Sequence, residues 1–146
     1  MKWEFRNGKP RIVKYLPYPG NYGMIPQTLL PKETGGDGDP LDVLLLGPAQ
    51  PRGSVIEARV IGVLKFLDGG EQDDKLLAVI PGTPLGDVHN FAQLKGKYGG
   101  ALEIVQLWFT HYKGPGVLAP QGIGGVDEAH SILDASIKAF VERTAK

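Results

Sequence analysis

The sequence predicts an α+β fold, in which a compact β-barrel or sheet carries two packed helices. Apolar runs of strand length occupy the first half of the 146-residue chain, whereas the long stretches of helical apolar spacing begin only after residue 100. Glycine and proline supply 21 and 12 residues, about twice their usual combined share. So many turn-forming residues indicate short elements joined by tight turns.

Three strands are expected between residues 41 and 80. Residues 41–46 form an apolar run that proline precedes and Gly-Pro follows. Residues 54–66 are rich in valine and isoleucine, and residues 75–80 form a further apolar run. The acidic segment 68–74 lies between these last two runs, which predicts a wide hairpin.

Two helices are expected to close the sequence. Apolar residues recur at helical spacing over residues 101–113, and Gly-Pro-Gly then stops the helix. A second helix is expected to begin with Asp127 as its N-cap and to carry one apolar stripe. The glycine-rich residues 114–125 are expected to connect the two helices over the surface.

Length, charge and composition narrow the class of protein. The chain has the length of one domain, residues 1–146. The absence of cysteine excludes disulfides, thiolate zinc sites and cysteine nucleophiles. Sixteen basic and sixteen acidic residues give no net charge, which argues against binding to nucleic acid or to an anionic membrane. With neither a signal peptide nor an apolar stretch long enough to span a bilayer, the chain is expected to be cytoplasmic.

The placement of aspartate is the feature that points to chemistry. Six of the nine aspartates lie between residues 37 and 74, and the tightest group is DGDPLD at residues 37–42. A solvated acidic turn is the simple alternative. Asp42, however, opens an apolar run, where an uncompensated charge costs several kcal/mol. We therefore expect a hard cation, Mg²⁺, Mn²⁺ or Ca²⁺, although an EF-hand is excluded because Asp42 and Pro48 replace its glycine and glutamate.

Basic side chains accompany the acidic groups along the chain. Lys75 follows Asp73 by two residues, so on a strand the two side chains are expected to face the same cavity. A cavity that combined five of the aspartates with three basic residues would be anionic without metal and cationic with two Mg²⁺ ions. Such a site would attract a polyphosphate anion only when metal is bound.

Four sequence motifs together resemble a known family. They are YPGNYG at residues 18–23, DGDPLDVL at residues 37–44, GVLK at residues 62–65 with the acidic segment that follows, and HYK at residues 111–113. In this order they are similar to the signature of the family I soluble inorganic pyrophosphatases. The resemblance implies a barrel of the OB type and Mg²⁺-dependent hydrolysis of diphosphate, with Mn²⁺ or Zn²⁺ as substitutes. It also implies a homo-oligomer, hexameric in bacteria and dimeric in eukaryotes.

The resemblance also implies roles for individual residues. Asp37, Asp42 and Asp73 resemble ligands of a first metal, and Asp42 also reaches a second. Asp68 and Asp73 resemble ligands of a third metal that arrives with substrate, Glu4 lies at the edge of the site, and Asp39 is the general base. The residues that match phosphate-binding positions are Lys2, Arg11, Tyr22, Lys75, Tyr112 and Lys113.

Two departures from the family pattern are expected to weaken the outer metal positions. The chain begins just before Glu4, without the preceding strand that carries a glutamate in longer relatives, and Gly69 stands where a second acid is common. Two other functions are considered. A different Mg²⁺ phosphohydrolase or a D-x-D transferase would need a βαβ pattern, and an inactive OB module for nucleic acid would need a basic groove.

Overall fold

The computed structural model describes residues 5–145. Its strands are β1 (Phe5–Arg6), β2 (Lys9–Pro10), β3 (Asn21–Met24), β4 (Asp42–Leu46), β5 (Arg59–Asp68), β6 (Glu71–Gln72), β7 (Lys75–Val79) and β8 (Leu118–Gly124). Its helices are the 3₁₀ turn η1 (Lys32–Thr34) and the α-helices α1 (Phe91–Lys97), α2 (Ala101–His111) and α3 (Val126–Thr144). None of the helices described is long and apolar enough to cross a membrane.

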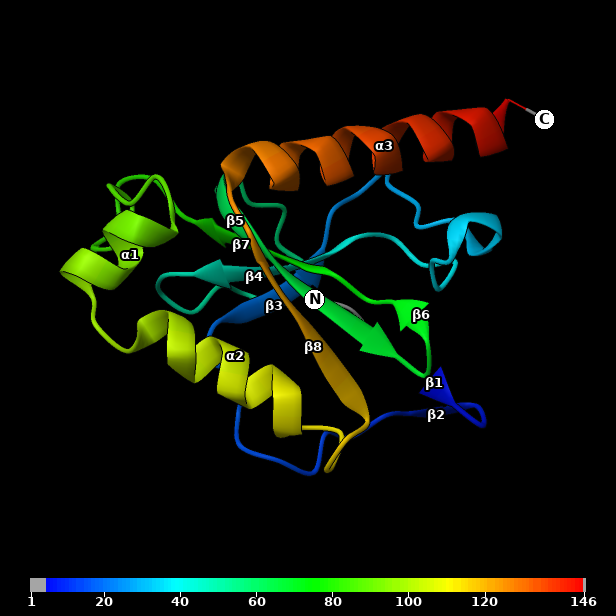
Figure 1. The fold of residues 1–146 in the computed structure, drawn as a ribbon, viewed down its shortest axis with the longest axis horizontal. Coiled ribbons are helices and arrows are strands. Elements are labelled where there is room, and N and C mark those ends of the chain that lie inside the picture. The colour runs from blue at the N-terminus through cyan, green and yellow to red at the C-terminus, as the bar shows by residue number, and fades with distance from the viewer. Residues whose placement is uncertain (1–4, 146) are drawn as a thin grey trace.

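A mixed six-stranded sheet forms the centre of the molecule (Figure 1). Its strands follow the order β3-β4-β7-β5-β6, and β8 also pairs with β5. β4 and β7 run parallel, whereas every other pair is antiparallel. Over residues 5–145 this sheet is open, because β3 and β6 end the hydrogen-bonded path without pairing with each other. The α+β prediction is confirmed, while closure into an OB barrel stays a prediction.

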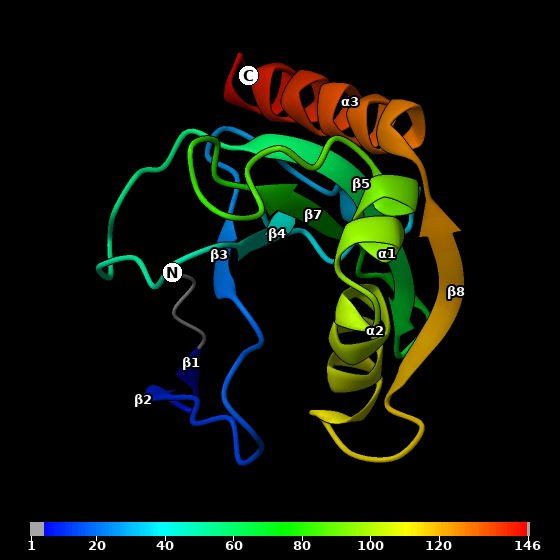
Figure 2. The same cartoon turned by 90° about the vertical axis from the view of Figure 1, so that its left-hand side faces the viewer.

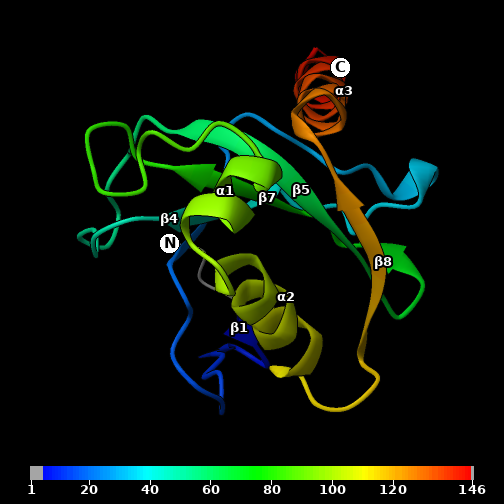
Figure 3. The same cartoon turned by 60° about the vertical axis from the view of Figure 1, so that its left-hand side comes forward.

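Helices cover both faces of the sheet, so its central strands contribute to two cores. Figures 2 and 3 show α3 over one face and α1 and α2 against the other. Leu44, Leu64 and Leu77 pack in one apolar cluster with Trp108 and other residues of α2. Val63 of β5 and Leu76 of β7, each next to one of these residues, point to the opposite face. There they pack with Leu41, which precedes β4, and with Ala129 of α3.

Two strands differ from the expected ones. β5 begins at Arg59, and the segment before it is irregular, with Val55 90% exposed. The segment expected to be a connector contains the strand β8. It was not predicted because it contains Pro120 and Gly122, which are unfavourable inside strands. This composition is tolerated because β8 pairs only with β5 and has a register shift beside Pro120.

The helix α1 is a third helix that the sequence analysis missed. It has only seven residues, too few to show helical periodicity, and Asn90 caps it by accepting a hydrogen bond from the Gln93 N–H. The predicted N-cap of α3 is also wrong, because Asp127 lies within the first turn and Gly125 is the capping residue. The carboxylate of Asp127 still favours this helix end, since it lies near the positive end of the helix dipole.

Gly62 allows α1 to dock on the sheet, and we expect Gly62→Ala to destabilise the fold. A Cβ atom at this position would lie 2.4 Å from Phe91 Cζ, so the ring would have to move. Overpacking of this kind costs about 1–3 kcal/mol, measurable as the free energy of urea unfolding. Gly96→Ala is the control: its added methyl meets nothing within 4 Å, and in a helix it should be neutral or stabilising. Equal stabilities of the two variants would contradict this account of the α1 docking.

Candidate functional site

A buried lysine lies at the centre of the charged cluster. Lys75 opens β7 directly beside Asp42 of the parallel strand β4 and is only 1% exposed. Its Nζ atom lies 2.7 Å from Asp42 Oδ2 and also donates a hydrogen bond to Asp73 Oδ1. Asp42 and Asp73 are themselves 4% and 6% exposed. The predicted burial of Asp42 is confirmed, and Asp73 and Lys75 point to the same place, as their spacing predicted.

Lys75 keeps its charge although it is buried. Burial alone would lower its pKa, but the charges of Asp42 and Asp73 and the hydrogen bonds to them outweigh burial and raise the pKa above its ordinary value. Because folding raises this pKa, the contribution of Lys75 to stability is fully present below about pH 10 and is lost only at more alkaline pH. The ammonium also compensates Asp42, so the burial of Asp42 does not by itself require a metal ion.

Tyr22 supplies a second hydrogen-bond donor to Asp42. It lies on β3, which pairs with β4, and its hydroxyl donates to Asp42 Oδ2. Burial, followed by the charge of Asp42, raises the pKa of Tyr22 well above its ordinary value, so the phenol stays protonated. Asp42 Oδ2 therefore accepts from both a phenol and an ammonium, which fixes its position.

Lys113 connects Asp73 to the next carboxylate in the cluster. Its Nζ atom lies 2.5 Å from Asp68 Oδ2 and 3.8 Å from Asp73 Oδ2. Asp68 ends β5, and Lys113 follows the C-terminus of α2, so the pair joins the sheet to the helix. Asp42, Lys75, Asp73, Lys113 and Asp68 thus form a continuous chain of alternating charge.

Aromatic rings support the basic side of this cluster. Arg11 and Lys113 both lie over the ring of Tyr112, at 5.8 and 5.6 Å from its centroid. The ring of Tyr112 stacks in turn on Trp108 at 4.7 Å. Arg11 and Lys113, both predicted to bind phosphate, are therefore both brought against the ring of Tyr112.

Tyr18 is a supporting residue that the sequence analysis did not single out. Its ring stacks on Tyr22 with centroids 4.7 Å apart and an interplanar angle of 6°. On its other side it lies 4.3 Å from the Trp108 ring. Tyr18 thus connects the Tyr22 hydroxyl donor to the α2 core. The available signal was its position in the motif YPGNYG at residues 18–23, four residues before Tyr22.

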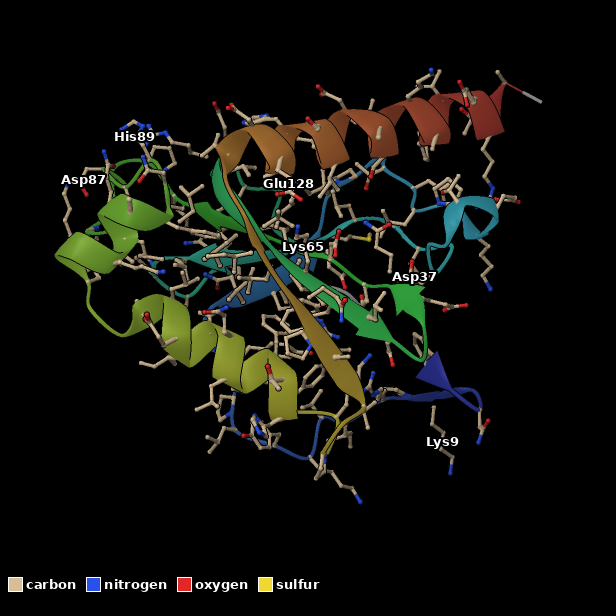
Figure 4. All side chains as sticks on the ribbon, viewed as in Figure 1. Lys9, Asp37, Lys65, Asp87, His89 and Glu128 are labelled. Atoms are coloured by element: carbon tan, nitrogen blue, oxygen red, sulfur yellow. The ribbon has the colours of Figure 1, made fainter. Side chains whose placement is uncertain are left out.

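Asp37 and Asp39 lie in a turn that a hydrogen bond between them closes. Gly38 has a φ of 84°, and the Asp39 N–H donates to Asp37 Oδ1 over 2.9 Å. An aspartate that bonds the backbone two residues further on stabilises such a turn. In space this turn lies between η1 and β6, where Figure 4 labels Asp37. Lys2, predicted to bind phosphate, and Glu4, predicted at the edge of the metal site, lie outside the described residues.

The donor atoms of this cluster suit Mg²⁺, although the site is not assembled around an ion. Carboxylate oxygens are the ligands that hard cations prefer. Within residues 5–145, however, no three carboxylate or histidine side chains come close enough together to hold one ion. Lys75 bonds one oxygen of Asp42 and one of Asp73, and Lys113 bonds one of Asp68. Carboxylate oxygens held in place in this way remain the kind of donor that a divalent cation binds.

A groove of about 840 Å³ lies beside the cluster without containing its carboxylates. Arg11 and Tyr22 line part of it, and most of its remaining lining is apolar, from β3, β4 and the loop before β5. The three histidines belong to the helical parts of the chain: Figure 4 shows His89 beside α1, His111 ends α2 and His130 lies within α3. The charged cluster is therefore the candidate functional site.

The fold and the charged cluster define an α+β protein with a site of alternating carboxylate and ammonium groups. Residues 3–141 match the family model described as inorganic pyrophosphatase. The chain belongs to the inorganic pyrophosphatase family. It is 39% identical over 130 residues to the inorganic pyrophosphatase of Haemophilus influenzae, covering 86% of this chain and 70% of that protein.

Other relatives show the same match over different shares of their length. The human inorganic pyrophosphatase is 38% identical over 131 residues, which cover 79% of this chain and 44% of the human protein. The solved inorganic pyrophosphatase of Helicobacter pylori has a TM-score of 0.78 and 30% identity, covering 95% of this chain and 85% of that one. The structure from T brucei brucei gives a TM-score of 0.86 and 27% identity, but the match covers only 45% of that chain.

We expect Lys75→Met to destabilise the protein strongly at neutral pH. The change leaves Asp42 and Asp73 buried without their ammonium partner, and breaking a buried ion pair costs about 3–5 kcal/mol. The loss should shrink towards about pH 4, because unpaired buried carboxylates can then take up protons. The measurement is the free energy of urea unfolding against pH, with a chelator present.

Lys65→Met is the control for this prediction. Lys65 forms an ion pair with Glu128 that lies on the surface, where Figure 4 labels both residues. Exposed pairs contribute little because water screens them. A loss for Lys75→Met no greater than that for Lys65→Met would show that the buried ion pairs do not organise this site.

Proposed function

We propose that this chain hydrolyses inorganic diphosphate to two phosphates with the help of Mg²⁺. The family supports the reaction, and its relatives carry the name inorganic pyrophosphatase. The structural observation that carries the proposal is the Asp73 carboxylate, which lies between the ammonium groups of Lys75 and Lys113. Three carboxylates and two ammonium groups leave this cluster with one net negative charge, so binding of a divalent cation would make it attractive to an anion.

By the family resemblance, Asp42 and Asp73 would hold the first ion together with Asp37 of the neighbouring turn. Asp68, at the end of β5, would take part with Asp73 in a further position. An ion bound there would neutralise phosphate oxygens and lower the pKa of a bound water. The weakening of an outer position by Gly69 stays a prediction; Gly69 lies in an exposed turn with a φ of 59°.

The protein's own residues would then bind the substrate and accept a proton from the attacking water. Arg11 and Lys113 share the Tyr112 ring and would bind phosphate oxygens, where positive charge stabilises the transition state for phosphoryl transfer. Asp39 is exposed on its turn and would accept a proton from the attacking water. Lys75 is buried against two carboxylates, so its first role is to hold them, and its contact with diphosphate stays a prediction.

The remaining sequence predictions complete the proposal. An OB-type barrel, assembly into a homo-oligomer and a cytoplasmic location are proposed from the family resemblance. Binding to nucleic acid or to a membrane is not proposed, because the chain has no net charge.

Phosphate release from diphosphate, measured with and without Mg²⁺, tests the function directly. We expect release that depends on Mg²⁺ and stops when a chelator removes the ion. Turnover of ATP and of a phosphate monoester should be far slower under the same conditions. Equal rates with and without divalent ions, or hydrolysis of the monoester alone, would contradict the proposal.

We expect Asp42→Asn to abolish turnover and to weaken metal binding sharply while the protein still folds. The amide keeps the shape of the carboxylate but loses the charge that a cation needs. Asp39→Asn is the comparison: loss of a proton acceptor should lower kcat strongly and change the Mg²⁺ midpoint little. Rates measured over a range of free Mg²⁺ separate the two effects. Near-normal turnover by Asp42→Asn would remove the metal-ligand role of that residue.

A further inference from the structure

The two halves of the proposed metal site come from distant segments that meet at Gln72. One half is the turn that carries Asp37, and the other is Asp73 at the entrance to β7. The Gln72 N–H donates to the Gly35 carbonyl over 2.8 Å, and Gly36 forms an isolated parallel bridge with Gln72. The residue immediately before Asp73 is therefore bonded to the segment immediately before Asp37.

The side chain of Gln72 is held by a buried carboxylate with no evident role of its own in the reaction. Asp74 is 3% exposed, and its Oδ2 atom accepts from Gln72 Nε2 over 2.6 Å. Its Oδ1 atom accepts from the Phe66 N–H of β5 over 3.3 Å. Among residues 5–145 Asp74 forms no ion pair. Burying a carboxylate that has no ion-pair partner is costly. The two hydrogen bonds that Asp74 accepts offset part of this cost.

The turn that carries Asp37 is also held from its opposite side. The Gly38 N–H donates to the Leu30 carbonyl over 2.8 Å, and the Leu30 N–H donates to the Asp39 carbonyl over 2.9 Å. A Cβ atom at Gly36 would lie 2.6 Å from the Leu30 carbonyl carbon and oxygen, so the backbone approaches Leu30 as closely as it can. The turn is therefore packed between Leu30 and Gln72, and a displacement of Gln72 would release one side of it.

We infer that Gln72 and Asp74 are positioning residues that set the place of Asp37 relative to Asp73 and so the affinity of the metal site. This inference rests on the proposed function, because it assigns the pair a role towards the ion that those aspartates would hold. Loss of residues that orient metal ligands typically weakens metal binding by about 10- to 100-fold. Neither residue needs to touch substrate, so the effect should fall on the Mg²⁺ midpoint far more than on kcat at saturating Mg²⁺.

An exchange of the two side chains separates geometry from charge. Gln72→Ala removes the hydrogen bond at unchanged net charge. Gln72→Glu alone places two carboxylates against each other, and like charges at this distance repel. Combining Gln72→Glu with Asp74→Asn restores one donor facing one acceptor, and the introduced amide oxygen can still accept from the Phe66 N–H. This double variant has the same net charge as the parent chain.

The test compares these variants in two measurements on the full chain. Calorimetric titration with Mg²⁺ alone gives the metal affinity without substrate, and hydrogen exchange of metal-free protein reports how firmly residues 35–41 are held. We expect Gln72→Ala to lose about 10-fold in affinity and to exchange faster in this segment. The double exchange should return both values towards those of the parent. Gln121→Ala, an exposed glutamine of β8, is the control and should change neither.

The outcomes distinguish this inference from the proposed function. Parent-like affinity and exchange in Gln72→Ala, with a parent that binds Mg²⁺ and hydrolyses diphosphate, would overturn the positioning role alone. A parent that neither binds Mg²⁺ nor hydrolyses diphosphate would overturn both proposals. If Gln72→Ala fails to fold, the double exchange decides: weakened affinity in that folded variant would show that the hydrogen bond between these positions does not set the site.

Discussion

The buried ammonium of Lys75 is the interaction on which the arrangement of this site depends. Asp42 and Asp73 come from different segments, and both are almost completely buried. Two carboxylates so close together repel each other unless positive charge lies between them. Lys75 bonds both, and this is possible because β4 and β7 pair in parallel with Asp42 directly beside Lys75. The register between β4 and β7 therefore determines the charge balance of the site.

The parallel pairing of β4 and β7 has consequences for the rest of the chain. Parallel neighbours need a long connection, and here the chain returns through β5, which lies antiparallel on the other side of β7. The same return places Asp68 at the end of β5, close to the acidic turn that leads into β7. Lys113 then reaches Asp68 from the end of α2. The carboxylates of the site meet because one strand crossover brings the ends of three strands together.

Much of the fold followed from local patterns, and the failures have physical causes. Uninterrupted apolar runs predicted β4 and β7, and helical spacing predicted α2 and α3. β8 was missed because its residues pack at an edge, where glycine and proline are tolerated and local preference is weak. Asp42 was predicted to be buried because it opens an apolar strand. Its compensation by Lys75 was not, because sequence spacing does not show which strands become neighbours.

The Gln72–Asp74 pair was beyond sequence reasoning for a different reason. Both residues lie in an acidic turn, and polar residues in a turn are normally read as solvated. The structure instead buries Asp74, which accepts hydrogen bonds from the Phe66 N–H of β5 and from the Gln72 side chain, while the Gln72 N–H donates to the Gly35 carbonyl. Burial raises the pKa of this carboxyl group above its ordinary value, and the hydrogen bonds from Gln72 and Phe66 oppose that rise.

Four packed aromatic rings explain how the polar groups of the site keep their positions. Tyr22 and Tyr112 each present a hydroxyl-bearing ring near the charged cluster, and Tyr18 and Trp108 stack between them. The Trp108 Nε1–H also donates to the Leu16 carbonyl over 3.0 Å, which ties the chain before β3 to α2. Rings with few rotatable bonds lose little entropy on packing and hold their polar ends in fixed directions. A site that acts through charge and position requires such support, because stabilisation of a transition state depends on dipoles and charges that are already in place.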